Sequence, residues 1–203
     1  MLASTLRPHA GHLTFGGARI TRRRIKPYRA VLGYLPQRPT WHGWMPVEDV
    51  LATFAWMHGV ANQDRSGVVD RALDRVDLAS RRHVRAGNLS GGQFQRLMLG
   101  AAIVHNPRVL LLDEPSVGLD PAQRAQLREI LSADCDRVTL ISTHVLADVA
   151  PIADQLIVVD EGRKRFDGSL TEFAELYGRE GKTDTAGLEV AYLNLIRGAD
   201  VAH

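Results

Sequence analysis

The sequence has one cysteine, Cys135, among 203 residues, which excludes an internal disulfide framework and a multi-cysteine zinc site. It also lacks a long apolar run. The longest, Leu97 to Val104, contains Gly100 and is far shorter than the roughly 20 residues of a membrane-spanning helix. With 45% hydrophobic and 24% charged residues, the composition is that of a globular protein, so disorder is excluded as the main state. The length is sufficient for one ordinary domain.

Acidic side chains are absent before Glu48, whereas this first stretch holds eight Lys and Arg residues. The whole chain is nearly balanced, with 25 basic and 23 acidic residues. An Arg-rich, acid-poor start is typical of a transit peptide or a nucleic-acid-binding arm. The alternation from His12 to Phe15, broken by Gly16 and Gly17, instead favours a folded sheet with a basic solvent face.

The rest of the chain alternates between the periodicities of strands and helices. Strands are expected at 31–35, 109–112, 138–142 and 155–159, with two short ones around 16–17. Residues 2–6 are expected to be the end of a helix. Two further helices are expected within 46–76, separated by a loop at 61–64, and others at 93–105, after 120–121, and near 145–150, 169–177 and 187–197. A hairpin turn is expected at 161–163. This order predicts an α/β fold in which parallel strands are joined by crossover helices.

Two adjacent carboxylates follow an apolar strand in the run Val109–Pro115. Ligands of open parallel sheets bind beyond the carboxyl ends of the strands. Asp113 could therefore hold Mg²⁺, which prefers oxygen ligands, and Glu114 could polarise an attacking water. The alternative is structural: a strand that ends in an Asp capping the next helix.

A second candidate site is the run Ser90-Gly91-Gly92-Gln93. Ser90 can cap the helix that follows, and the paired glycines let a ligand approach the backbone. The amide groups at such a helix start bind anions. The alternative is an ordinary capped helix without a ligand.

Together these motifs resemble those of the ATP-binding cassette (ABC) ATPases. The matching runs, in family order, are Gly33–Gln37, which is similar to the Q-loop, then Leu89–Gln93, Leu111–Pro115, Gly118–Asp120, and Ser142–His144, which is similar to the switch-histidine segment. The resemblance extends from near Met1 to about Gly168. It implies an α/β, P-loop NTPase-like ABC ATPase domain with a parallel core sheet, a small antiparallel β part and a helical subdomain. That domain is partial and N-terminally truncated, covering residues 1–168 with the helical subdomain at about 38–88, and a short helical tail follows at 169–203.

The resemblance also implies roles at the carboxyl ends of the strands. Asp113 would ligate Mg²⁺, and Glu114 would be the general base for ATP hydrolysis. Gln37 would join the metal and the water, and His144 would contact the γ-phosphate. By themselves, Gln37 could be a turn residue and His144 a helix cap.

The helix-start motif implies partners. Ser90, Gly91, Gly92 and Gln93 would bind the nucleotide of an opposing ABC ATPase subunit, identical or different, and Asp120 would lie in the loop that crosses that interface. A transmembrane permease would be the other partner, and no nucleic acid is expected. The chain would then be cytoplasmic and peripheral on the inner face of the cell membrane. Its compact tail resembles that of export-type cassettes.

One family motif is missing, the phosphate loop Gly-x-x-x-x-Gly-Lys-[Ser/Thr], whose amides and lysine hold the phosphates of ATP. Gly181-Lys182-Thr183 imitates its end, but Leu176 stands where the first glycine belongs and the run follows the carboxylates instead of preceding them. Residues 2–11 resemble the segment that normally follows the loop. We therefore expect a core sheet that lacks one strand and its covering helix, with weak ATP binding and negligible hydrolysis by this chain alone.

Three interpretations remain open. The start is misassigned or truncated, and the gene product is a working transport ATPase, which an in-frame phosphate loop in the upstream DNA would support. Alternatively, the short form is genuine and is a degenerate half-subunit that lends Ser90, Gly91 and Gly92 to the ATP site of a partner. Third, the chain belongs to a non-transport branch of the family, although it lacks the coiled-coil insertions or tandem cassettes usual there.

Overall fold

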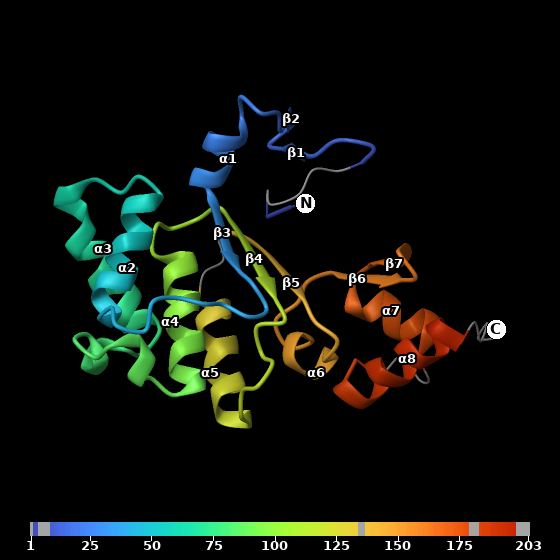
Figure 1. Ribbon diagram of the computed structural model, residues 1–203. Helices are drawn as coiled ribbons and strands as arrows, with labels where there is room; N and C mark the ends of the chain where they lie inside the picture. Colours follow the sequence, from blue (N-terminus) through green and yellow to red (C-terminus); the bar gives the residue numbers. More distant parts are fainter. Residues whose placement is uncertain (1, 4–8, 134–136, 179–182, 198–203) are drawn as a thin grey trace. The chain divides into compact units, whose positions relative to one another are not determined.

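A computed structural model describes residues 2–3, 9–133, 137–178 and 183–197 (Figure 1). The chain divides into two compact units, Met1–Ser142 and Thr143–His203, and each is described by itself. No helix in the described ranges is long and apolar enough to cross a membrane. The domain boundary near residue 168 stays a prediction. The predictions for Cys135, for Gly181-Lys182 and for most of the helix end at 2–6 concern residues outside the described ranges.

The first unit contains the following elements in chain order: β1 Thr14–Phe15, β2 Ala18–Arg19, α1 Ile25–Ala30, β3 Leu32–Leu35, α2 Val47–Met57, α3 Asn62–Arg75, the 3₁₀ turns η1 Ala79–Arg81 and η2 Ala86–Asn88, α4 Gly91–Ile103, β4 Val109–Asp113, α5 Pro121–Ser132 and β5 Val138–Ser142. Strands β3, β4 and β5 form a parallel sheet in that order (Figure 1). The predicted parallel pairing with crossover helices is confirmed.

Helix α4 covers one face of this sheet, on which Leu35, Leu110 and Leu112 are almost completely buried. Gly33 is required on that face, because a Cβ built on it would overlap the carbonyl oxygen of Ala102 in α4. The glycine of β3 therefore lets the α4 backbone lie directly against the sheet.

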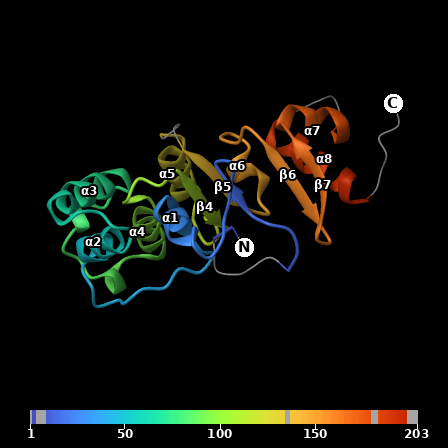
Figure 2. The ribbon, with the colours of Figure 1, turned by 90° about the horizontal axis from the view of Figure 1, so that it is seen from above.

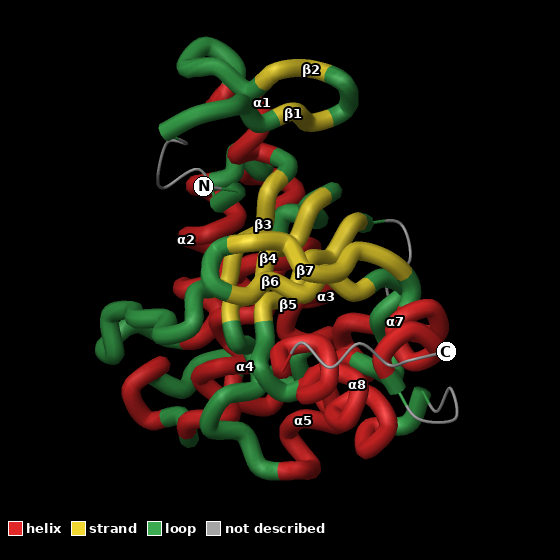
Figure 3. The backbone as a smooth tube through the Cα atoms, turned by 90° about the vertical axis from the view of Figure 1, so that its right-hand side faces the viewer, coloured by secondary structure: helices red, strands yellow, loops and turns green. Residues whose placement is uncertain are grey.

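On the opposite face, α1 and the β1–β2 hairpin, which lie together in Figure 3, pack against the part that holds Leu32, Val109 and Leu111. Tyr28 of α1 is buried with Leu32 and Leu111, and its ring meets Phe15 edge-on at a centroid distance of 5.7 Å. The sequence pattern predicts only sheet in this segment, and α1 is a difference from that prediction. This helix has no side-chain cap and is fixed by the burial of Tyr28, which the local pattern does not reveal.

Strand β5 is an edge strand of the described sheet. Val138 and Leu140 are 68% and 42% exposed. They share the sheet face of Leu111, because Leu111 pairs with Leu140 and side chains alternate along each strand. Apolar surface thus stays open at the β5 end of that face.

Helices α2 and α3 pack against α4, and Figure 2 shows the three grouped together. The two helices predicted within 46–76 are confirmed, and Val47, Val50, Leu51, Leu73 and Val76 of this region are fully buried. Helix α3 begins at Asn62, inside the stretch expected to be a loop, and its N-cap residue Ala61 still has an extended backbone.

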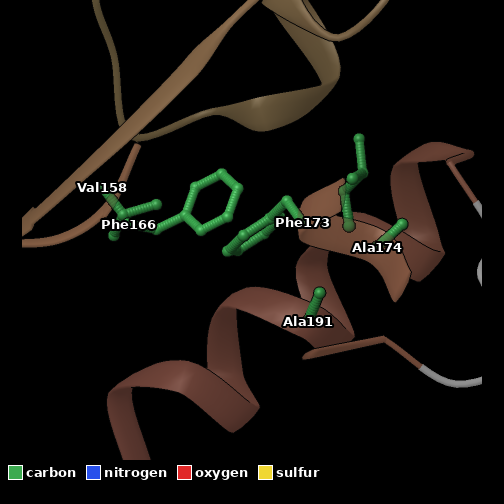
Figure 4. Close-up of a cluster of buried hydrophobic side chains, with 6 residues drawn as sticks. Val158, Phe166, Phe173, Ala174 and Ala191 are labelled. Carbon is green, nitrogen blue, oxygen red and sulfur yellow. The ribbon is translucent and has the colours of Figure 1, made fainter. Parts of the chain in front are cut away.

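The second unit contains these elements: α6 Leu146–Val149, β6 Leu156–Asp160, β7 Arg163–Gly168, α7 Leu170–Tyr177 and α8 Thr185–Arg197. Strands β6 and β7 are antiparallel, and the predicted turn between them is confirmed by the positive φ angles of Glu161 and Gly162. Phe166 and Phe173 meet at a centroid distance of 4.9 Å. Figure 4 shows them in the core of this unit, with Val158, Ala174 and Ala191 around them.

Candidate functional site

The two adjacent carboxylates stand at the carboxyl end of β4, next to the end of β5. Asp113 pairs with Ser142, and Ser142 Oγ donates a hydrogen bond of 2.5 Å to Asp113 Oδ1. The amide of Glu114 donates to the Ser142 carbonyl at 2.9 Å, and Glu114 has a left-handed φ of 48°. Strain of this kind in a non-glycine residue is typical of functional turns. The end of β5 therefore fixes the carboxylate of Asp113 and the backbone of Glu114.

The structural alternative for Asp113 is excluded by the position of the next helix. Helix α5 begins only at Pro121 and is capped by Asp120, so Asp113 caps no helix. The loop between β4 and α5 is tied to α4, because Gln95 Nε2 donates to the Pro115 carbonyl at 3.2 Å. This bond joins the carboxylate loop to the helix that begins after Ser90.

Ser90 caps α4, as predicted. The amide of Gln93 donates to Ser90 Oγ at 3.3 Å, and the amide of Ser90 donates to Gln93 Oε1 at 3.1 Å. This reciprocal capping box leaves the amides of Gly91 and Gly92 without an intrahelical acceptor. Gly91 is exposed, and a Cβ on it would meet nothing within 4 Å. The start of α4 is thus a capped helix with an open approach to its first amides.

Asp120 makes the same arrangement at α5. The amide of Gln123 donates to Asp120 Oδ1 at 2.9 Å, and the amide of Asp120 donates to Gln123 Oε1 at 3.2 Å. Gly92 is buried against this second cap, since a Cβ on it would lie 2.6 Å from Gln123 Oε1. The starts of α4 and α5 therefore lie side by side.

The remaining predicted residues differ in where they lie. Gln37 is exposed, two residues after β3, whose end lies beside that of β4 because Leu35 pairs with Leu112. His144 is exposed and belongs to the second unit, two residues after β5. The first unit thus gathers Gln37 and the carboxylates at one sheet edge, and the role of His144 stays a prediction.

Sequence reasoning missed three supporting residues. Ser142 was noted only as part of a run and not as the hydroxyl that contacts Asp113. Gln123 could have been found, because Asp-x-x-Gln is a capping-box pattern. Gln95 had no signal, since its contact with the Pro115 carbonyl joins segments 20 residues apart.

The residues present fit only part of a Mg–ATP site. Among the described residues, no group of three or more His, Cys, Asp or Glu side chains could hold a metal ion. Mg²⁺ is commonly bound by one or two carboxylates together with the phosphates of its nucleotide, so Asp113 suits that role once phosphates are supplied. The sequence given has no phosphate loop to hold them.

Comparison with known proteins agrees with this fold. The ABC transporter family model matches residues 1–117, and the chain therefore belongs to this family. It is 32% identical over 176 residues to the uncharacterized ABC transporter ATP-binding protein YxlF of Bacillus subtilis (strain 168), covering 86% of the chain and 58% of YxlF. It is also 32% identical over 173 residues to the Nod factor export ATP-binding protein I of Burkholderia orbicola (strain AU 1054), covering 83% of the chain and 56% of that protein.

Among solved structures, the chain is similar to the ATP-binding subunit of an ABC transporter, with a TM-score of 0.81 and 23% identity over 96% of this chain and 80% of that one. At this identity the likeness shows the fold alone. The chain spans less than three-fifths of the two curated relatives.

Proposed function

We propose that the chain is the ATP-binding subunit of an ABC transporter that serves export. It would dock on a transmembrane permease at the inner face of the cell membrane and pair with a second ABC ATPase subunit. The names of the two relatives support this, since one is an ABC transporter ATP-binding protein and the other an export ATP-binding protein. The family uses ATP with Mg²⁺.

The observation that carries the proposal is the common edge formed by the ends of β3, β4 and β5. Asp113 would offer one oxygen ligand to Mg²⁺, oriented by the Ser142 hydroxyl. Glu114, fixed in its left-handed turn by the Ser142 carbonyl, would accept a proton from the attacking water. Gln37 would orient that water, and His144 would contact the terminal phosphate. Bound Mg²⁺ would neutralise the phosphate charge that these carboxylates otherwise repel.

A second role is favoured by the open start of α4, which Ser90 caps. The capping box of Ser90 leaves the amides of Gly91 and Gly92 for a phosphate, an arrangement that needs no other group of this chain. Asp120 lies beside it on α5. We infer that the chain lends this half-site to a partner that holds ATP with its own phosphate loop, and that its own hydrolysis is negligible.

Both statements can be tested on the purified chain with Mg–ATP as the probe. We expect a single-turnover assay to give no hydrolysis above the rate in buffer. We also expect nuclear magnetic resonance to show weak, saturable shifts of the Gly91 and Gly92 amides that disappear in Ser90→Arg. Hydrolysis that Glu114→Gln abolishes would contradict the inference that hydrolysis by this chain alone is negligible. Unchanged Gly91 and Gly92 amide signals at saturating nucleotide would contradict the inference that the start of α4 binds a phosphate.

A further inference from the structure

Helix α3 ends in a Schellman motif built on an unusual residue. The amide of Leu78 donates to the Leu73 carbonyl at 2.9 Å, and the amide of Asp77 donates to the Asp74 carbonyl at 3.1 Å. Asp77 occupies the left-handed position of this motif with a φ of 52°. Glycine is usual there because it has no Cβ penalty. An aspartate in this strained position indicates that contacts of its side chain compensate for the backbone strain.

The Asp77 carboxylate joins two other helices. Arg96 Nη1 of α4 donates to Asp77 Oδ2 at 2.9 Å, and Gln126 Nε2 of α5 donates to the same oxygen at 3.1 Å. Arg96 Nη1 also reaches the carbonyls of Val76, at 2.9 Å, and of Asp77 itself, at 3.2 Å. One oxygen at the end of α3 thus contacts both α4 and α5.

These two donors hold equivalent places on their helices. Arg96 is the sixth residue after the cap of α4, Ser90, and Gln126 is the sixth after the cap of α5, Asp120. The first turns of the two helices also touch, where Gly92 lies against Gln123. The starts of α4 and α5 are therefore joined at two levels, and the second level passes through Asp77.

The charges agree with this arrangement. The Arg96 side chain is only 13% exposed, whereas that of Asp77 is 76% exposed. An exposed carboxylate gains little from an ion pair, but a largely buried guanidinium needs one near it. The hydrogen bond from Arg96, and then that from Gln126, lowers the pKa of Asp77. The carboxylate is thus charged at neutral pH. Its main effect is to accept hydrogen bonds from Arg96 and Gln126, rather than to stabilise α3.

We propose that Asp77 is a positioning residue that holds the starts of α4 and α5 in a fixed relation and couples both to the end of α3. A displacement of the α2–α3 region would then reach Ser90 and Asp120 together. This goes beyond the proposed function, because it is a property of the first unit without nucleotide or partner.

Hydrogen exchange of the purified chain, without nucleotide, tests the coupling. In Asp77→Gly we expect amides 94–98 and 124–128 to exchange about tenfold faster, while the relief of backbone strain at residue 77 offsets part of the global stability lost when Arg96 loses its carboxylate. Asn106→Gly is the matched control. Asn106 also has a φ of 52° but lies at the other end of α4, so those amides should keep their rates.

A second variant separates the coupling from a local effect on α3. Asp77→Asn removes the charge but retains an acceptor oxygen and a residue that tolerates the left-handed conformation, so its rates should rise less than those of Asp77→Gly. Unchanged or slower exchange at amides 94–98 and 124–128 in Asp77→Gly would overturn the proposal, because Asp77 would then only terminate α3. Exchange that rises in the Asn106→Gly control as well would also overturn it. The nucleotide titration above is unaffected by either outcome.

Discussion

The backbone of Gly92 lies against the side chain of Gln123, and any Cβ at residue 92 would overlap that side chain. Gln123 has no freedom to withdraw, because it completes the capping box of Asp120. In Gly92→Ala we therefore expect α5 to lose its cap or α4 to shift, with a loss of about 1–3 kcal/mol of stability. Urea unfolding followed by circular dichroism measures it.

Gly91→Ala is the matched control for this substitution. A Cβ on Gly91 meets nothing within 4 Å, and alanine is favoured over glycine in a helix by about 0.5–1 kcal/mol. We expect the control to be neutral or stabilising. Equal losses in the two variants would show that the contact with Gln123 does not limit residue 92.

The cap of α4 gives a second prediction. Ser90→Ala removes the acceptor of the Gln93 amide and should cost about 1 kcal/mol. Ser169→Ala removes the same kind of cap from α7, where no nucleotide role is proposed, and should cost about as much. Only Ser90→Ala should weaken the shifts that Mg–ATP induces at Gly91 and Gly92. Equal weakening in both variants would contradict a ligand role for this helix start.

Local patterns were sufficient for part of the fold and of the site. The apolar run of β4, its two carboxylates and the cap at Ser90 each depend on residues close in sequence, and all were predicted. Helix α1 was missed because Tyr28 is fixed by Leu32 and Leu111, and such burial leaves no periodic signal in a short helix. The contact of Gly92 with Gln123 escaped prediction for a similar reason, since it joins two helices.

A stacked histidine pair gives the third prediction. The rings of His58 and His105 are 3.7 Å apart at their centroids, with planes 12° from parallel, and His105 Nε2 donates to the Leu32 carbonyl at 3.2 Å. Burial, and then the positive charge of His58 when protonated, lowers the pKa of His105 to about 4. Burial also lowers the pKa of His58. Both rings are therefore neutral in the folded chain at pH 7.

The sign of the pH dependence follows. The unfolded chain binds a proton at residue 105 near the ordinary pKa of 6.5, whereas the folded chain does so only near 4. The contribution of neutral His105 to the free energy of unfolding is thus fully present above pH 6.5. It declines by about 3 kcal/mol as the pH falls towards 4. His105→Phe should flatten this slope in urea unfolding between these pH values. His12→Gln, at an exposed side chain, should leave the slope unchanged. A slope in His105→Phe as steep as that of the parent chain would contradict the assignment to His105.

The open edge of β5 gives the last prediction. An unpaired strand without charge, proline or bulge pairs readily with other chains, and β5 has the sequence Val-Thr-Leu-Ile-Ser. Strand β7 by contrast begins with Arg163, Lys164 and Arg165, all exposed. Val138→Lys with Leu140→Lys should therefore reduce self-association in sedimentation velocity. Because both side chains are exposed, the stability should change by only about 0.5 kcal/mol.

Val117→Lys is the control, because Val117 is 47% exposed but lies in the loop after β4. It adds charge without altering the strand edge, so self-association should stay close to that of the parent chain. If the control reduces association as much as the β5 variant does, net charge and not the strand edge is responsible. A loss of more than about 2 kcal/mol in the β5 variant would instead mean that Val138 and Leu140 are packed in solution, and the sheet would then have no open apolar edge at β5.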